Sequence, residues 1–173
     1  SGTVIPVDTI RFIRLVSEEE RSRIADRYGV DGKGFQISIQ FADRTTKLAR
    51  ETLDEIRSQG VALVNIGADR HVVAANIKQA SPFSKDDASK LSETRGYTLG
   101  QTFRSKVELT AGTVLSSATP SQIMERRARA MEANSSAPKA ARAEKIKSAA
   151  EIQTAVIRFG LFIPMIVPPR KLF

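Results

Sequence analysis

The chain has 173 residues, of which 41% are hydrophobic and 27% charged, with no cysteine and a formal net charge of +8 at pH 7. This composition is typical of one globular domain with an appendage, and the lack of cysteine excludes disulfides, thiolate nucleophiles and cysteine-based metal centres. We expect no signal peptide, since residues 1–16 lack a basic start followed by an apolar run. We expect no membrane span either, because the longest apolar stretch, residues 159–167, is shorter than the roughly 20 residues that cross a bilayer. The sequence thus predicts a cytoplasmic protein, or one carried within a virus particle.

The first elements alternate between strand and helix. Residues 7–16 are rich in β-forming side chains and predict a strand. Ser17 and Glu20 then have the spacing of a capping box, which predicts a helix that runs to about Tyr28 and stops at Gly29. Residues 35–41 alternate between apolar and polar side chains and predict a strand with one buried face. Its polar face is either solvent-exposed or a binding surface.

The middle of the chain predicts both element types again. Residues 44–59 have the apolar periodicity of an amphipathic helix, and Gly60 is suited to end it. The next 50 or so residues have strand and cap patterns separated by turn residues. They predict, in order, a hairpin of strands 61–66 and 71–79, a helix from Ser84 to about Gly96, and a strand at 103–109.

The last third of the chain changes character. Thr119 and Pro120 form a helix entry, with the threonine as cap and the proline in the first turn, and the helix is expected over residues 121–133. A second helix at about residues 139–153 has a thin apolar face and cannot bury much surface by itself. The tail is expected to be extended, because its prolines forbid a continuous helix. These are Pro164, Pro168 and Pro169.

Together these elements predict an α+β fold. A mixed β-sheet packed by about three helices would occupy residues 3–118, followed by a basic helical extension (119–153) and an extended apolar tail or arm (154–173). The strand–helix order of the first 80 residues implies some parallel pairing, to which the hairpin adds antiparallel pairs.

No arrangement of side chains argues for catalysis, and we expect a protein that is not an enzyme and has no catalytic residues, metal or cofactor. His71 is the only histidine, so a Ser–His–Asp arrangement would depend on it, whereas a strand-entry position beside a turn is the simpler interpretation. Asp86 and Asp87 fall in a first helical turn, where acids stabilise the helix dipole. The turn at residues 31–34 precedes a strand and lacks the spacing of a phosphate loop.

Positive charge is concentrated at the C-terminal end. Residues 120–173 carry ten Lys and Arg against four Glu, a net of +6 out of the chain's +8. Such a concentration indicates binding to nucleic acid, RNA or DNA without sequence preference, or to an acidic protein surface. The leading hypothesis is therefore a nucleic-acid-associated protein of a nucleoprotein complex or virus particle. Its phosphate contacts are predicted at Arg126, Arg127, Arg129, Lys139, Arg142, Lys145 and Lys147.

Arg127 has two interpretations. On a helical wheel Arg126 and Arg129 project away from the apolar side chains, whereas Arg127 falls within their stripe. It is either a side chain whose stem packs on the edge of the core, or a guanidinium held in place for a phosphate or a partner's carboxylate. The apolar side chains of this wheel are Ile123, Met124, Ala128 and Met131.

The apolar tail also has two interpretations. It returns to its own domain as a closing strand, or it reaches a neighbouring subunit and adds a strand or apolar side chains there. The second interpretation gives an alternative function, a structural subunit of a capsid or another homo-oligomer that is locked to its neighbours by its C-terminal helices and tail. Its interface residues would be Phe159, Leu161, Phe162, Ile163, Met165, Ile166 and Val167.

Overall fold

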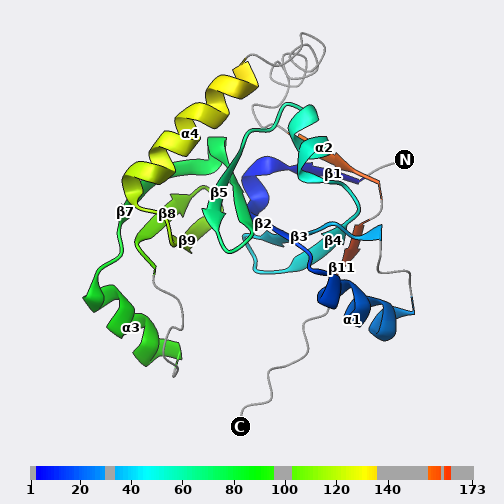
Figure 1. Ribbon diagram of the computed structural model, residues 1–173, viewed down its shortest axis with the longest axis horizontal. Helices are drawn as coiled ribbons and strands as arrows, with labels where there is room; N and C mark the ends of the chain where they lie inside the picture. The colour runs from blue at the N-terminus through cyan, green and yellow to red at the C-terminus, as the bar shows by residue number, and fades with distance from the viewer. Residues whose placement is uncertain (1–2, 30–33, 96–102, 136–155, 161, 165–173) are drawn as a thin grey trace.

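The structure is a computed structural model that describes residues 3–29, 34–95, 103–135, 156–160 and 162–164 (Figure 1). In this part of the chain the helices are α1 (Glu18–Tyr28), α2 (Leu53–Ser58), α3 (Lys85–Arg95) and α4 (Pro120–Ser135). Two short 3-10 turns are η1 (Val7–Thr9) and η3 (Ala74–Asn76). The strands are β1 (Thr3–Pro6), β2 (Ile10–Leu15), β3 (Ile37–Phe41), β4 (Thr46–Ala49), β5 (Leu63–Gly67), β6 (Arg70–Val73), β7 (Ile77–Pro82), β8 (Ser105–Leu109), β9 (Gly112–Ser116), β10 (Val156–Phe159) and β11 (Phe162–Pro164). The fold is α+β.

Three sheets hold these strands. The largest has the order β11-β4-β3-β2-β6-β5, a second has the order β7-β8-β9, and β1 pairs with β10 alone. Every strand pair among the described residues is antiparallel. The expectation of parallel pairing was therefore wrong. The segment 44–59, predicted as one helix, is divided between strand β4 and the short helix α2, so no crossover helix separates β3 from β4.

This division is caused by a turn at residues 43–45 and a helix cap at Thr52. Neither was recognised in the sequence, because the apolar residues of this segment have helical spacing. The Asp43 carboxylate accepts hydrogen bonds from the backbone N–H (2.9 Å) and the hydroxyl (2.6 Å) of Thr45. Arg44 between them has a left-handed φ of 68°, so the chain reverses into β4. Thr52 and Glu55 then form a reciprocal capping box that starts α2 only after β4 has ended.

Strands β5 and β6 lie between two hydrophobic cores, and most of their side chains are buried in one or the other. Leu63 and Val73 enter a first core, which α2 and β10 close. Val64 and Val72 face the opposite way and enter a second core, which β8, β9 and α4 close. Strands buried on both faces give continuous apolar runs, which accounts for the unbroken Val-Ala-Leu-Val sequence at residues 61–64.

The predicted strand at residues 71–79 is interrupted by η3. Asn76 is 4% exposed, and its side-chain amide donates to the carbonyls of Val7 (2.7 Å) and Ile10 (3.2 Å). The Val7 carbonyl also accepts the Ile10 N–H at the end of η1, so Asn76 adds a second donor there and ties η3 to η1 and to the start of β2. The bend sends the chain from β6 in the six-stranded sheet to β7 in the three-stranded one. Strand β9, which the sequence analysis did not predict, completes the second sheet.

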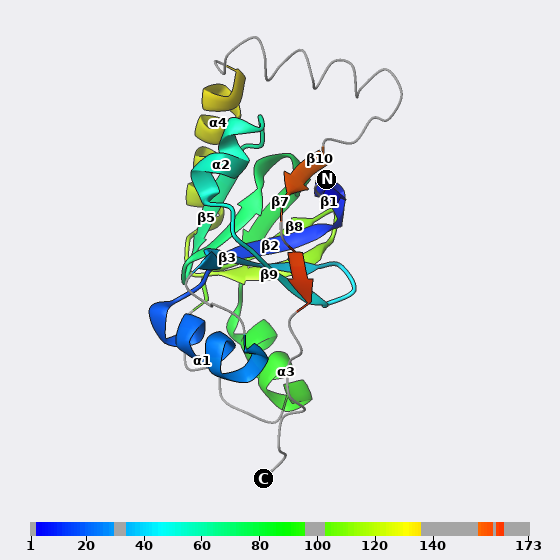
Figure 2. The same cartoon turned by 90° about the vertical axis from the view of Figure 1, so that its right-hand side faces the viewer.

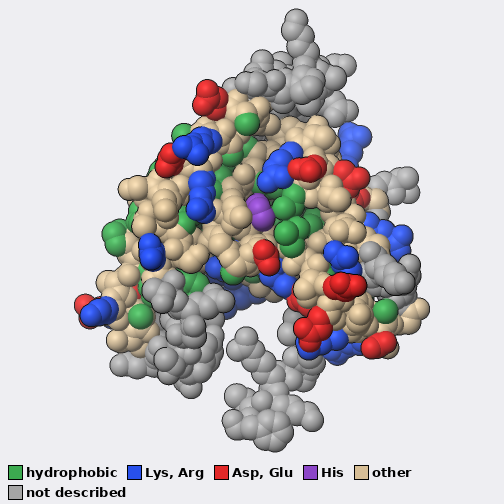
Figure 3. Space-filling model, in the orientation of Figure 1, with side chains coloured by type: hydrophobic (Ala, Val, Ile, Leu, Met, Phe, Trp, Pro, Cys, Tyr) green, Lys and Arg blue, Asp and Glu red, His purple; other side chains and the backbone are tan. Residues whose placement is uncertain are grey.

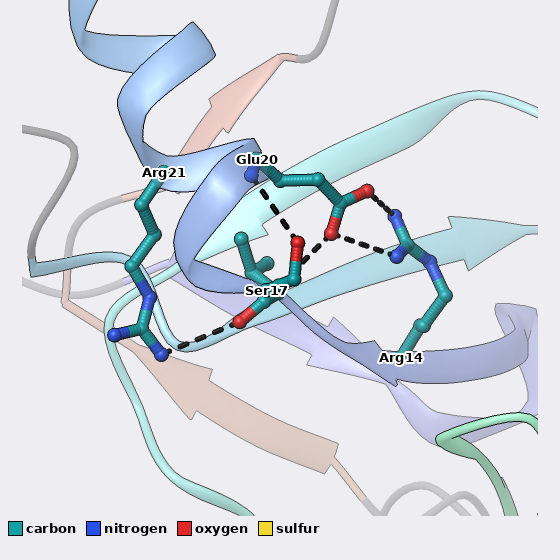
Figure 4. Close-up of polar contacts among 5 residues, drawn as sticks. Arg14, Ser17, Glu20 and Arg21 are labelled. Carbon is teal, nitrogen blue, oxygen red and sulfur yellow. Dashed lines mark hydrogen bonds and ion pairs between the residues drawn. The ribbon is translucent and has the colours of Figure 1, made fainter.

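The capping box predicted for α1 is confirmed. The Ser17 hydroxyl accepts from the Glu20 N–H, and the Glu20 carboxylate accepts from the Ser17 N–H (Figure 4). Arg14 of β2 adds two hydrogen bonds to the same carboxylate, at 2.6 and 2.9 Å. The bonds from Arg14, together with those from Ser17, lower the pKa of Glu20 to about 2. The helix ends at Gly29, whose φ of 63° is the left-handed conformation expected of a C-terminal glycine.

Helices α1 and α3 lie at one end of the molecule, and α4 runs along its side (Figures 1 and 2). Helix α3 begins as expected after Ser84, whose hydroxyl accepts from the Asp87 N–H while the Asp87 carboxylate accepts from the Ser84 N–H. Asp87 therefore serves as a helix cap, as its position in the sequence indicated.

Candidate nucleic-acid interface

Helix α4 is fixed to the sheets at its first turn and along one face. The Thr119 hydroxyl accepts from the Gln122 N–H (3.2 Å), and the side-chain oxygen of Gln122 accepts from the Thr119 N–H (2.9 Å). Ile123 is fully buried in the second core, and the helix packs on β5 and β7. The side chains on its outer face are therefore presented from a rigid support.

The three arginines of α4 make three different contacts. Arg126 is exposed and donates through Nη1 to the backbone carbonyl of Asn65 in β5 (2.9 Å). Arg127 is half-buried and donates through Nε to the carbonyl of Ala74 in η3 (3.2 Å). Arg129 is exposed and forms an ion pair with Glu125 (2.5 Å). Arg126 and Arg129 are thus the two that present their charge outward.

The packed face of α4 differs from the apolar stripe seen in the sequence. Ile123, Arg127 and Ala130 face the protein, whereas Met124 and Met131 are 39% and 37% exposed. The reason is that the Arg127 guanidinium finds a backbone acceptor at the edge of the core while its stem covers apolar surface. The remaining predicted phosphate contacts, Lys139, Arg142, Lys145 and Lys147, lie outside the described residues.

Arg57 of α2 joins the same face, although the sequence analysis did not single it out. Asn65, which accepts from Arg126, is the cross-strand partner of His71, and the positive charge of Arg57 is close enough to lower the pKa of that histidine. Figure 3 shows Lys and Arg side chains over α4 and α2, on two sides of the only histidine. No sequence signal could place Arg57 there, because α2 was predicted as part of a longer helix.

Carboxylates partly neutralise this face. Arg57 pairs with Asp54 at 2.9 Å, and Arg129 pairs with Glu125. Both pairs are exposed, and exposed pairs contribute about 0–1 kcal/mol, so an incoming phosphate can exchange with the carboxylate at little cost. The Arg126 guanidinium has a backbone partner but no ion pair among the described residues.

His71 lies in the middle of this face but is 7% exposed, and its Nδ1 is buried without a hydrogen-bond partner in the described part of the chain. Burial lowers the pKa of His71, and the charge of Arg57 lowers it further, whereas Asp69 acts in the opposite direction. The imidazole is therefore neutral at pH 7 and adds no positive charge to the face. Its position just after the β5–β6 turn agrees with the strand-entry interpretation.

The predicted interface residues of the tail are divided between described and undescribed parts. Phe159 is 1% exposed and lies in the first core of its own chain. Phe162 and Ile163 lie in β11, which pairs with β4 of the same chain. Leu161, Met165, Ile166 and Val167 lie outside the described residues.

Within the described ranges, no three His, Asp or Glu side chains come together in a way that could hold a metal ion. None of the helices described is both long and apolar enough to cross a membrane. Compared with known proteins, the chain matches no protein-family model, no curated protein and no solved structure at a significant level.

Proposed function

We propose that this is a non-enzymatic, nucleic-acid-associated protein of a nucleoprotein complex or virus particle. It would bind the phosphate backbone through α4 and the basic segment that follows it. The proposal is supported by the net charge of +6 in residues 120–173 and by the exposed arginines at the start of that region.

The observation that carries the proposal is the contact of Arg126. A guanidinium has five N–H donors, and one donor of Arg126 is bound to the Asn65 carbonyl while the side chain stays exposed. This hydrogen bond restricts the side chain before any ligand arrives, so less conformational entropy is lost when the other donors bind a phosphate. Arg126 is thus a preorganised anion ligand on a rigid helix.

The other basic residues have distinct roles in this proposal. Arg129 would exchange Glu125 for a phosphate, and Arg127 would mainly hold α4 in position through the Ala74 carbonyl. The lysines and arginine at positions 139, 142, 145 and 147 would extend the contact along the chain. Because residues 120–153 contain no aromatic side chain, bases are not stacked there, and binding is electrostatic and indifferent to sequence.

A matched pair of arginines tests the proposal. Arg129–Glu125 on α4 and Arg23–Glu19 on α1 are both exposed ion pairs four residues apart on a helix. Arg129→Gln and Arg23→Gln therefore remove the same charge from the same local environment. We expect Arg129→Gln, and likewise Arg126→Gln, to reduce the slope of log affinity against log salt concentration by about 0.7–0.9 per residue. Arg23→Gln is expected to leave it unchanged.

Binding of a labelled random-sequence oligonucleotide over a salt series gives these slopes. Equal effects of the α1 and α4 variants would indicate a general charge effect without a site on α4. Reversal of charge at Arg126, Arg127 and Arg129 together that left both affinity and slope unchanged would rule the proposal out.

A further inference from the structure

The C-terminal strands form a strap, defined as residues 156–160 and 162–164, that lies across the first core. Strand β10 pairs with β1 over four residue pairs, from Thr3↔Phe159 to Pro6↔Val156. Strand β11 pairs with β4, at the end of the six-stranded sheet. The strap is thus attached to two strands, β1 and β4, that lie far apart in the chain.

Two side chains next to α2 bind the other edge of β10. The Gln59 carboxamide donates to the Arg158 carbonyl (3.0 Å) and accepts from the Arg158 N–H (2.8 Å), as a neighbouring strand would. The Glu51 carboxylate accepts from the Gly160 N–H at 2.6 Å. The body of the protein therefore has a slot for this strand, with β1 on one side and Gln59 and Glu51 on the other.

The strap also fills the first core. Ile157 is 0% and Phe159 1% exposed, while Arg158 between them is exposed. Full burial of side chains of this size contributes about 1.5–3 kcal/mol each. The slot therefore needs an apolar–polar–apolar strand to be stable, and residues 157–159 of this chain have that pattern.

The connection between the strap and the rest of the chain is long. Twenty residues, 136–155, separate the end of α4 from the start of β10. A segment of 20 residues spans at most about 66 Å, and this length sets how far the strap of one chain can reach toward another copy. All strap–body contacts are the same whether the strap comes from the same chain or from another copy.

We infer that the strap is exchangeable between copies of this chain, and that two copies form a dimer by inserting their straps into each other's slots. The occupant of the slot is a second copy because the slot matches the strap of this chain, residues 156–160 and 162–164. The dimer is closed by two-fold symmetry, and its share of the protein rises with protein concentration. This inference is independent of nucleic-acid binding.

The lack of cysteine allows a direct test with engineered disulfides. Val4 and Arg158 are directly opposite in the β1–β10 pair, and both are exposed, within the range that a disulfide bridges. One full-length variant carries Val4→Cys and another carries Arg158→Cys. The two are unfolded together in urea and refolded as a mixture at about 1 mM and at about 10 µM under oxidising conditions. A third variant with both substitutions shows whether the disulfide forms within one chain.

Exchange predicts that a disulfide-linked dimer of the Val4→Cys and Arg158→Cys chains forms at the higher protein concentration. The yield of this dimer should be at least tenfold lower at the lower concentration. A mixture of Val4→Cys with Arg104→Cys, an exposed position outside the β1–β10 pair, gives the level of random cross-linking. A cross-link yield no higher than that of this control would overturn exchange. Failure of the double variant to form its own disulfide would overturn the strand register on which exchange depends.

Discussion

Arginine side chains in this protein often bind backbone carbonyls. Arg11 of β2 and Arg70 of β6 donate to the carbonyls of Thr113 (2.7 Å) and Leu115 (2.6 Å) in β9, the outer strand of its sheet. Together with Arg126 and Arg127 of α4, they join elements that strand pairing does not connect. The net charge of +8 is therefore only partly available for a ligand, because some of these guanidinium groups maintain the fold.

The bonds between Arg14, Ser17 and Glu20 predict a loss of stability in acid. Since the folded pKa of Glu20 is about 2 and the ordinary value is 4.5, the carboxylate stabilises the folded state above about pH 4.5, and this stabilisation is lost as the pH falls toward 2. Glu20→Gln should lower the free energy of unfolding by about 1 kcal/mol at pH 7 and by less at pH 3. Urea titrations at both pH values measure the difference. Asp26→Asn is an exposed change on the same helix. The free energy of unfolding of this variant should change between pH 7 and pH 3 by as much as that of the wild type.

His71 predicts a separate loss of stability nearer to neutral pH. Burial lowers its folded pKa below the ordinary 6.5, so the unfolded chain takes up a proton first and stability declines as the pH falls below about 6.5. His71→Phe keeps an aromatic ring of similar size but cannot titrate. Thermal unfolding between pH 7 and pH 5 should show a smaller decline for this variant. An identical decline in the wild type and the variant would contradict the assignment of a buried, neutral imidazole.

At the scale of elements, α4 depends on one arginine more than on the others. Arg127→Ala removes one of two donors to the Ala74 carbonyl, the other being the Ile77 N–H, together with part of the packed face. We therefore expect the free energy of unfolding to fall by about 1–2 kcal/mol. Arg126→Ala removes an exposed hydrogen bond and should cost less than 1 kcal/mol. Denaturant titration of both variants gives the comparison. An equal loss for the two would mean that Arg127 is not the residue that anchors α4.

Elements with strong local signals could be predicted from the sequence, whereas those decided by distant contacts could not. The caps at Ser17 and Ser84 and the β5–β6 hairpin depend on neighbouring residues, and their patterns identified them. The bend at Asn76 depends on the carbonyls of Val7 and Ile10, which lie 69 and 66 residues earlier in the chain. The residues around Asn76 therefore could not predict these hydrogen bonds. The segment 44–59 was misread because β4 and α2 in succession happen to have helical apolar spacing.

The candidate site could be predicted only in part, for the same reason. The sequence identified the arginines of α4 from their clustering. It could not show that Arg127 turns inward to Ala74 or that Arg57 reaches the same face, since both depend on how α2, α4 and the sheet meet. Charge clustering locates a basic segment, but tertiary contacts determine which of its side chains remain exposed.

At the scale of the whole molecule, two parts of the chain have different tasks. The sheets, the four described helices and the strap form the folded body, to which residues 136–155 are attached at both ends. Of the net charge of +6 in residues 120–173, residues 120–135 carry +1, residues 136–155 carry +2 and residues 156–173 carry +3, so the basic charge continues along the chain beyond α4. The strap is bound to a body in the monomer and in the exchanged dimer alike, so both ends of the basic segment are fixed in either form.

The most direct test of the central claim is the affinity of the full chain for a random-sequence oligonucleotide, measured between about 50 and 200 mM salt. With several of the seven predicted cations in contact with phosphate, at about 0.7–0.9 each, we expect a log–log slope of about −3 to −6 that is the same for unrelated base sequences. A slope near zero, or no binding at the lowest salt concentration, would contradict a phosphate-binding function for the basic C-terminal region.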